Sequence, residues 1–170
     1  NAAITVAERT VDAAERASRA EIILQIDERF TQFDHVNKAF RDQTIERFLL
    51  PDERGLDQWS DVDKYMGVFE RIHSFVELNL MDIGFVWDFY GYRYVNVVRS
   101  EVVRERCLKK QQSSWFRFID LGQQMQCYLD ASIPTNLRSP EQEPGHYLAM
   151  ITDPETSALP SMPKVNQSIP

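Results

Sequence analysis

The chain is poor in cysteine and glycine, and it has no long apolar run. Its 170 residues include two cysteines, Cys107 and Cys127, and six glycines that never cluster. Small secreted domains that depend on disulfides carry more cysteine, so we expect both thiols to be reduced and semi-buried in a cytoplasmic protein. Isolated glycines exclude a P-loop, which needs a glycine-rich loop ahead of Lys-Ser/Thr. No stretch approaches the roughly 20 apolar residues that span a bilayer, and the first residues show no signal-peptide pattern.

Catalytic sequence motifs are missing as well. The sequence contains no Gly-x-Ser-x-Gly, Cys-x-x-Cys or His-Glu-x-x-His. A Cys–His nucleophile pair stays open, although no spacing favours one. We therefore assign no catalytic residue and no cofactor. Hydrophobic residues at 43% and charged residues at 26% are typical of a globular domain, and 170 residues are enough for one domain with a core.

Apolar residues recur at helical spacing through most of the chain, which predicts an all-α fold. Asp82 is the expected N-cap of one helix, Asp34 is a candidate cap for another, and Ser113 or Ser114 for the last. We expect a single irregular helical bundle of about five to six helices within a domain spanning residues 1–130. The expected helices are 3–33, 35–50, 60–78, 82–99, 101–110 and 114–130.

The segment from Asp61 to Arg99 is the expected packing centre, because it holds nine of the nineteen aromatic residues. The short connection between its two helices predicts that they lie antiparallel and adjacent. Three tyrosines in it, Tyr90, Tyr92 and Tyr94, are two positions apart and cannot all face one side of a helix. Core packing with hydroxyls at the rim is the preferred interpretation, and an aromatic ligand groove is the alternative.

The chain changes character after Asp130. Seven of its eight prolines lie in residues 131–170, which leaves room for at most one short helical turn, around His146–Ile151. We expect this extended proline-rich tail to pack on the domain or on a neighbouring copy. Its candidate anchors are Ile133, Leu137, Tyr147, Leu148, Met150, Ile151, Leu159 and Met162.

One group of residues suggests a metal site. Glu70 and His73 lie three apart, and Glu77 follows one turn later, so a helix would place them on one face. Di-iron bundles use a Glu-x-x-His unit, but they need it twice together with two further glutamates, and this chain has three histidines. The alternative is that Glu70 pairs with an arginine while His73 is a satisfied residue at a helix interface.

Charge is unevenly distributed, which suggests a second candidate site. The net charge is −7, with 14 acids and 8 bases in residues 1–63 but 2 acids and 7 bases in residues 93–117. The basic segment could contact phosphates of nucleic acid or anionic lipid headgroups. We prefer a solvated face that balances the acidic helices, and we regard nucleic acid as a less favoured partner. Its candidate residues are Arg99, Arg104, Arg106, Lys109, Lys110 and Arg117.

Several runs carry a resemblance to a known family. They are Tyr65–Ile72, Leu80–Asp82 and Trp87–Gly91, with continuations in Val95–Arg106 and Trp115–Leu121 and weaker ones in Arg19–Phe33. These runs resemble an uncharacterised bacterial family, domain of unknown function family 4760, over about 100 of the 170 residues. The resemblance implies a small helical protein, in many members with a membrane-spanning segment ahead of the helices, and it implies no activity. The proline-rich tail lies outside it.

These observations favour a non-enzymatic helical interaction or regulatory module. The alanine-rich first helix is poor in large apolar residues and needs a neighbour, so we expect a homodimer with an unidentified protein partner. The cytoplasmic face of a membrane is one location that the basic segment and the resemblance allow. Two alternatives remain: a metal-dependent helical enzyme using Glu70 and His73, and a nucleic-acid-associated protein using residues 93–117.

Overall fold

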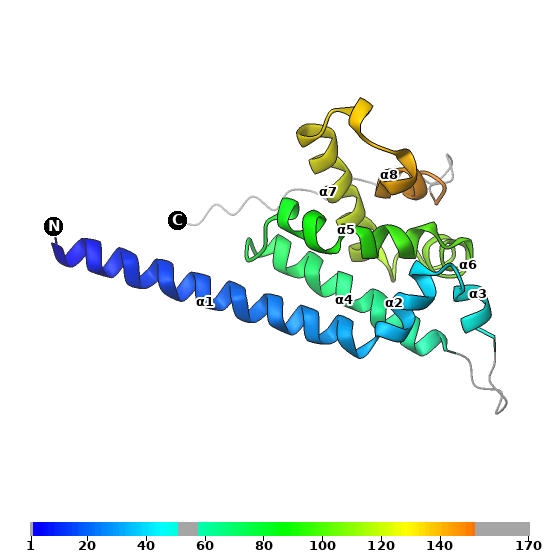
Figure 1. Ribbon diagram of the computed structural model, residues 1–170, viewed down its shortest axis with the longest axis horizontal. Coiled ribbons are helices and arrows are strands. Elements are labelled where there is room, and N and C mark those ends of the chain that lie inside the picture. The colour runs from blue at the N-terminus through cyan, green and yellow to red at the C-terminus, as the bar shows by residue number, and fades with distance from the viewer. Residues whose placement is uncertain (1, 51–57, 152–170) are drawn as a thin grey trace, which may run out of the picture.

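The computed structural model describes residues 2–50 and 58–151, and the regular elements of this part are all helical (Figure 1), which confirms the all-α prediction. A π-helix (η1, Arg104–Lys109) continues α6, and two 3₁₀ turns (η2, Thr135–Leu137; η3, Pro140–Gln142) precede α8. The α-helices are α1 (Ala2–Gln32), α2 (Asp34–Arg41), α3 (Ile45–Phe48), α4 (Trp59–Glu77), α5 (Ile83–Arg99), α6 (Glu101–Val103), α7 (Phe116–Ser132) and α8 (Pro144–Leu148).

Helix α4 lies at the centre of the core. Its stripe of large apolar residues is buried against α1, α5 and α7, and Phe69 has no exposed surface. The Phe69 ring meets Tyr94 of α5 and Phe118 of α7 edge to face, at centroid distances of 5.5 and 5.6 Å. Tyr94 in turn stacks on Phe118 at 4.5 Å. Such aromatic pairs stabilise by about 0.5–1.5 kcal/mol each beyond the area they bury, so these rings fix how the three helices sit together.

The connection between α4 and α5 is as short as the sequence predicts. Asn79 takes a left-handed backbone conformation, with a φ of 55°, and ends α4. Asp82 then caps α5, since its Oδ1 accepts hydrogen bonds from the backbone N–H groups of Gly84 and Phe85 at 2.8 and 3.2 Å. Because only a few residues separate the two helices, α5 turns back over α4 (Figure 1).

The prediction of one helix over residues 35–50 is wrong. Two helices, α2 and α3, cover this region and are separated by a turn in which Gln43 has a φ of 55°. The Thr44 N–H bonds back to the Ala39 carbonyl at 2.9 Å and closes the turn. This break allows Ile45 and Leu49 to reach the core.

Two predicted caps are also wrong. Asp34 is the first residue of α2, and Phe33 occupies the cap position, because α2 begins directly after α1 ends. Trp115 occupies the cap position of α7 in place of Ser113 or Ser114, and its side chain is buried. In both places an aromatic residue that packs on the core sets the helix start, and neither cap residue makes a side-chain hydrogen bond.

Helix α1 is only partly attached to the rest of the molecule. Its C-terminal part packs on α4 through Ile26 and Phe30. Its N-terminal part extends beyond the other helices (Figure 1), and the side chains of residues 13, 14 and 16–21 are exposed. We call residues 2–20 of α1 the arm. At the usual rise of 1.5 Å per residue the arm is about 28 Å long.

The described part of the proline-rich segment packs on α5 and α7. Tyr147, Leu148 and Ile151 are buried, and the Arg138 guanidinium holds Asp130 and Glu143 at 2.8 and 3.4 Å. The helical turn begins at Pro144, two residues before the predicted start, as suits a proline at the first helical position. Two expected anchors, Leu137 and Met150, are exposed, and Ile133 is half-buried. Leu159 and Met162 lie outside the described residues.

Candidate functional site

A buried histidine facing a carboxylate forms the centre of the candidate site. His73 lies on α4 and is 4% exposed, and its Nε2 is 2.7 Å from Oδ2 of Asp120 on α7. The Phe116 ring, one turn before Asp120, meets the imidazole edge to face at 6.2 Å. The imidazole Nδ1 is buried and has no hydrogen-bond partner among the described residues. The ring is therefore held by packing and by a single polar contact.

A second carboxylate lies beside this pair. Glu77 follows His73 by one helical turn, so the two side chains share a face of α4. The amide of Gln124 links the two acids, because its Nε2 donates to Asp120 Oδ2 at 2.7 Å and to Glu77 Oε1 at 3.3 Å. One possible ligand atom from each of His73, Glu77 and Asp120 lies within 4.8 Å of the others. This arrangement could hold a cation.

Glu70 does not belong to this group, although the sequence suggested the Glu70–His73 pair. Burial raises the pKa of the Glu70 carboxyl, while the positive charge of Arg117 and the nearby His73 oppose that rise. The structure thus places Glu70 near Arg117. The third possible ligand, beside His73 and Glu77, is Asp120 and not Glu70. Asp120 is 47 positions from His73, and no spacing rule links the two. One feature of the sequence pointed to Asp120 as a site residue. It lies between the apolar residues Phe118 and Leu121, which places it at the edge of the core.

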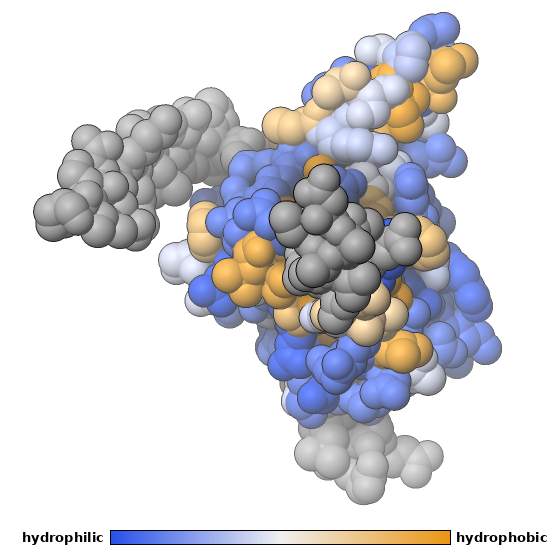
Figure 2. Space-filling model, turned by 90° about the vertical axis from the view of Figure 1, so that its left-hand side faces the viewer, coloured by the Kyte–Doolittle hydropathy of each residue, from blue (hydrophilic) through white to orange (hydrophobic). Residues whose placement is uncertain are grey.

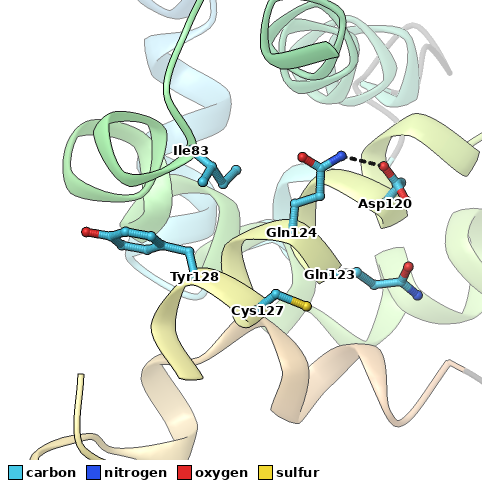
Figure 3. A pocket seen from close by; sticks show the side chains of 6 residues that line it. All are labelled: Ile83, Asp120, Gln123, Gln124, Cys127 and Tyr128. Atoms are coloured by element: carbon cyan, nitrogen blue, oxygen red, sulfur yellow. Dashed lines mark hydrogen bonds between the residues drawn. The ribbon is translucent and has the colours of Figure 1, made fainter. Parts of the chain in front are cut away.

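The site opens to a hollow that follows α7. On one side Leu78, Phe116 and Arg117 line it together with the three candidate ligands. Further along α7 lies a second hollow, which Asp120 and Gln124 also line (Figure 3). Its other lining residues include Ile83 at the start of α5, Cys127 and Tyr128. The hollow is therefore accessible from solvent along one side of α7.

The two cysteines are both free and differ in exposure. Cys127 is exposed beside the second hollow, whereas Cys107 is buried in the core, so the expectation of two semi-buried thiols is wrong. Burial and the nearby Asp63 raise the pKa of the Cys107 thiol to about 11, with Arg106 opposing them. Because the thiolate is the reactive form, Cys107 is an unreactive core residue.

The predicted basic residues mostly contact other parts of this chain. Arg104 donates to the backbone carbonyls of Val98 and Arg99 at 2.7 and 2.6 Å and so caps the end of α5. Arg106 stacks on the Trp59 ring at 3.9 Å, and Lys109 pairs with Glu105 at 2.6 Å. Arg99 donates to the Glu141 carbonyl, Arg117 lies near Glu70, and Lys110 is exposed. The arginines therefore point to different neighbours along α4, α5 and η3.

The three tyrosines of α5 occupy different environments. Tyr94 is fully buried and donates to the Phe118 carbonyl at 2.9 Å. Tyr90 is buried against α1, where it donates to Asp27 at 3.0 Å. Tyr92 is exposed and borders a hollow with Trp87 and Arg99. Tyr92 faces a surface hollow, whereas Tyr90 and Tyr94 are buried against different elements, so the three do not line one groove.

Comparison of the chain with models of protein families, with curated proteins and with solved structures finds no match. The resemblance to domain of unknown function family 4760 therefore stays a prediction.

Proposed function

We propose that this protein is a non-enzymatic helical interaction module that pairs with a second copy of itself through the arm of α1. The observation that carries the proposal is the arm, whose side chains at residues 13, 14 and 16–20 are exposed. The arm is continuous with the packed part of α1, so it needs no nucleus of its own, but most helical stability in proteins comes from tertiary packing. A partner that packs on the arm should therefore stabilise it as a helix.

The arm sequence suits a second helix as the partner. Ile4, Ala7, Val11 and Ala14 recur with steps of three and four residues, which is the spacing of the a and d positions of a coiled coil. Two of the four are alanines, so the backbones of two helices could approach closely there. An identical arm from a second copy presents the same spacing.

The surface around the base of the arm supports the same proposal. Leu24 of α1, Leu78 after α4 and Phe89 of α5 are 63%, 66% and 57% exposed, and they belong to elements that meet at this end of the molecule (Figure 1). Figure 2 looks at this end and shows several apolar areas between hydrophilic ones. Large exposed apolar side chains at one end of a molecule are typical of an interaction surface.

The cytoplasm is the location that this proposal favours, because both cysteines are free thiols. In the part of the chain that the structure describes, no helix has the length and apolar character needed to cross a bilayer. An anionic membrane surface and nucleic acid are less supported as partners, because Arg99, Arg104, Arg106 and Lys109 are engaged within the chain.

Two neighbouring alanines provide a matched test. Ala14 lies on the proposed stripe, whereas Ala13 lies on another side of the helix, and both are exposed. Glutamate is nearly as good a helix former as alanine, so Ala14→Glu and Ala13→Glu should each leave the helix itself intact. Sedimentation equilibrium of the full chain should show a dimer whose dissociation constant rises at least about 10-fold in Ala14→Glu and stays unchanged in Ala13→Glu. A monomeric wild-type protein, or equal effects of the two substitutions, would refute the proposal.

A further inference from the structure

We propose that His73, Glu77 and Asp120 form a binding site for one divalent transition-metal ion of the zinc class. The three residues offer an imidazole nitrogen and two carboxylate oxygens from two adjacent helices. Zinc binds these donor types, and three protein ligands plus water is a common arrangement for it. The site is independent of the arm of α1, so it does not rest on the proposed function.

Charge favours a cation at this position. Neither Glu77 nor Asp120 has a lysine or arginine within ion-pair distance among the described residues, and His73 is the basic side chain that Asp120 meets. Two neighbouring carboxylates repel each other, and the Gln124 amide is the group that donates hydrogen bonds to both of them. A divalent ion between the two carboxylates would offset their repulsion more strongly than the dipole of the Gln124 amide does. A rotated Gln124 amide would then turn its carbonyl oxygen toward the ion.

The distances allow closure around an ion. Zinc–nitrogen and zinc–oxygen bonds are about 2.0–2.2 Å, so two ligand atoms of a tetrahedral zinc ion lie about 3.4 Å apart. The three candidate atoms already lie within 4.8 Å of one another. His73 is fixed by burial, whereas Glu77 is exposed and Asp120 has a third of its side chain exposed. The two carboxylates can therefore cover the remaining distance, up to about 1.4 Å, by rotation of their side chains.

The environment of His73 limits the affinity. An ion on Nε2 moves the ring proton to Nδ1, which is buried without a partner among the described residues. Metal-bound histidines normally donate this proton to a second group, and loss of such a contact weakens binding by about 10- to 100-fold. We therefore expect a dissociation constant of about 1–100 µM for Zn²⁺ rather than a nanomolar value. A histidine ligand also disfavours Mg²⁺, which prefers oxygen donors alone.

Calorimetric titration with Zn²⁺ tests the site directly. The full chain, without a histidine tag and freed of metal by a chelator, should bind one ion, and Asp120→Asn and Glu77→Gln should each weaken binding at least about 10-fold. Both substitutions are nearly isosteric and lie on partly exposed side chains, so the fold should persist, which a thermal melt verifies. In ¹⁵N-histidine spectra, Zn²⁺ should shift the signals of His73 and move its proton to Nδ1.

Two control variants keep the test specific. Glu70→Gln removes a carboxylate that lies on the same helix but outside the three ligands. His35→Gln removes a second His–Asp pair, in which His35 Nε2 lies 3.0 Å from Asp61 at the surface, with no third possible ligand among the described residues. Both controls should bind Zn²⁺ within about twofold of wild type. Binding weaker than about 1 mM, or an equal loss in a control variant, would overturn the proposal.

Discussion

Gly122 should be the glycine least tolerant of substitution in the core. It lies in the middle of α7, where a Cβ atom would clash with the Tyr94 hydroxyl and lie 2.6 Å from Tyr94 Cζ and 2.8 Å from Leu148 Cδ1. Tyr94 cannot easily move away, because it is fully buried, stacked on Phe118 and hydrogen-bonded to the Phe118 carbonyl. Gly67, in the middle of α4, is the matched control, since a Cβ there meets nothing within 4 Å.

The expected magnitudes follow from these contacts. Overpacking a core costs about 1–3 kcal/mol, and losing the Tyr94 hydrogen bond costs about 1 kcal/mol more. Alanine offsets about 1 kcal/mol of this, because it is the better helix former. Gly122→Ala should therefore lower the free energy of unfolding by about 2 kcal/mol. Gly67→Ala should raise it by up to about 1 kcal/mol, since only the helix propensity changes.

Urea unfolding followed by circular dichroism measures both variants in the same way. A Tyr94→Phe background adds a check on the cause, because it removes the atom nearest to the new Cβ. Gly122→Ala should cost about 1 kcal/mol less in that background, which is the coupling expected between contacting residues. Equal stability of Gly122→Ala and wild type would refute the packing argument. A loss in Gly67→Ala as large as that in Gly122→Ala would do the same.

Three further predictions concern a cap, a carboxyl group and the thiols. Asp82→Ala should lower the free energy of unfolding by about 1 kcal/mol in urea, because the Gly84 and Phe85 N–H groups lose their acceptor. Burial raises the pKa of Glu70 above 4.5, so the folded chain holds that proton more tightly and this carboxyl lowers stability as the pH rises through its folded pKa. Glu70→Gln should therefore melt higher than wild type near pH 7, and a gain that is undiminished near pH 4 would contradict this cause. In a thiol titration of the native protein, Cys127 should react quickly and Cys107 only on unfolding, and two fast thiols would contradict the assigned burial.

Periodicity within a helix could be predicted well from the sequence. The stripe through Tyr65, Phe69 and Ile72 is fully buried, and Asp82 caps α5 as its position before an apolar run suggests. Both features depend on residues a few positions apart, and local sequence reports such relations directly. The same holds for the all-α class.

Features that depend on distant residues could not be predicted. The break at Gln43 has no glycine or proline to mark it, and it exists because Ile45 and Leu49 pack on the core after the chain turns. The pairing of His73 with Asp120 depends on the register between α4 and α7, which local spacing does not contain. For the same reason the basic residues looked like one patch, although Arg104 and Arg106 are directed to different partners.

The register between α4 and α7 connects the core to the candidate site. Phe69 and Phe118 set where the two helices meet, and Tyr94 fits against Gly122 on the other side of the contact. Asp120 lies between Phe118 and Gly122 in the sequence, so the packing that fixes those two residues also fixes its carboxylate opposite His73. A substitution that shifts α7 should therefore disturb the His73–Asp120 pair even though it touches neither residue. The aromatic core thus does more than stabilise the fold, because it determines which carboxylate faces the buried histidine.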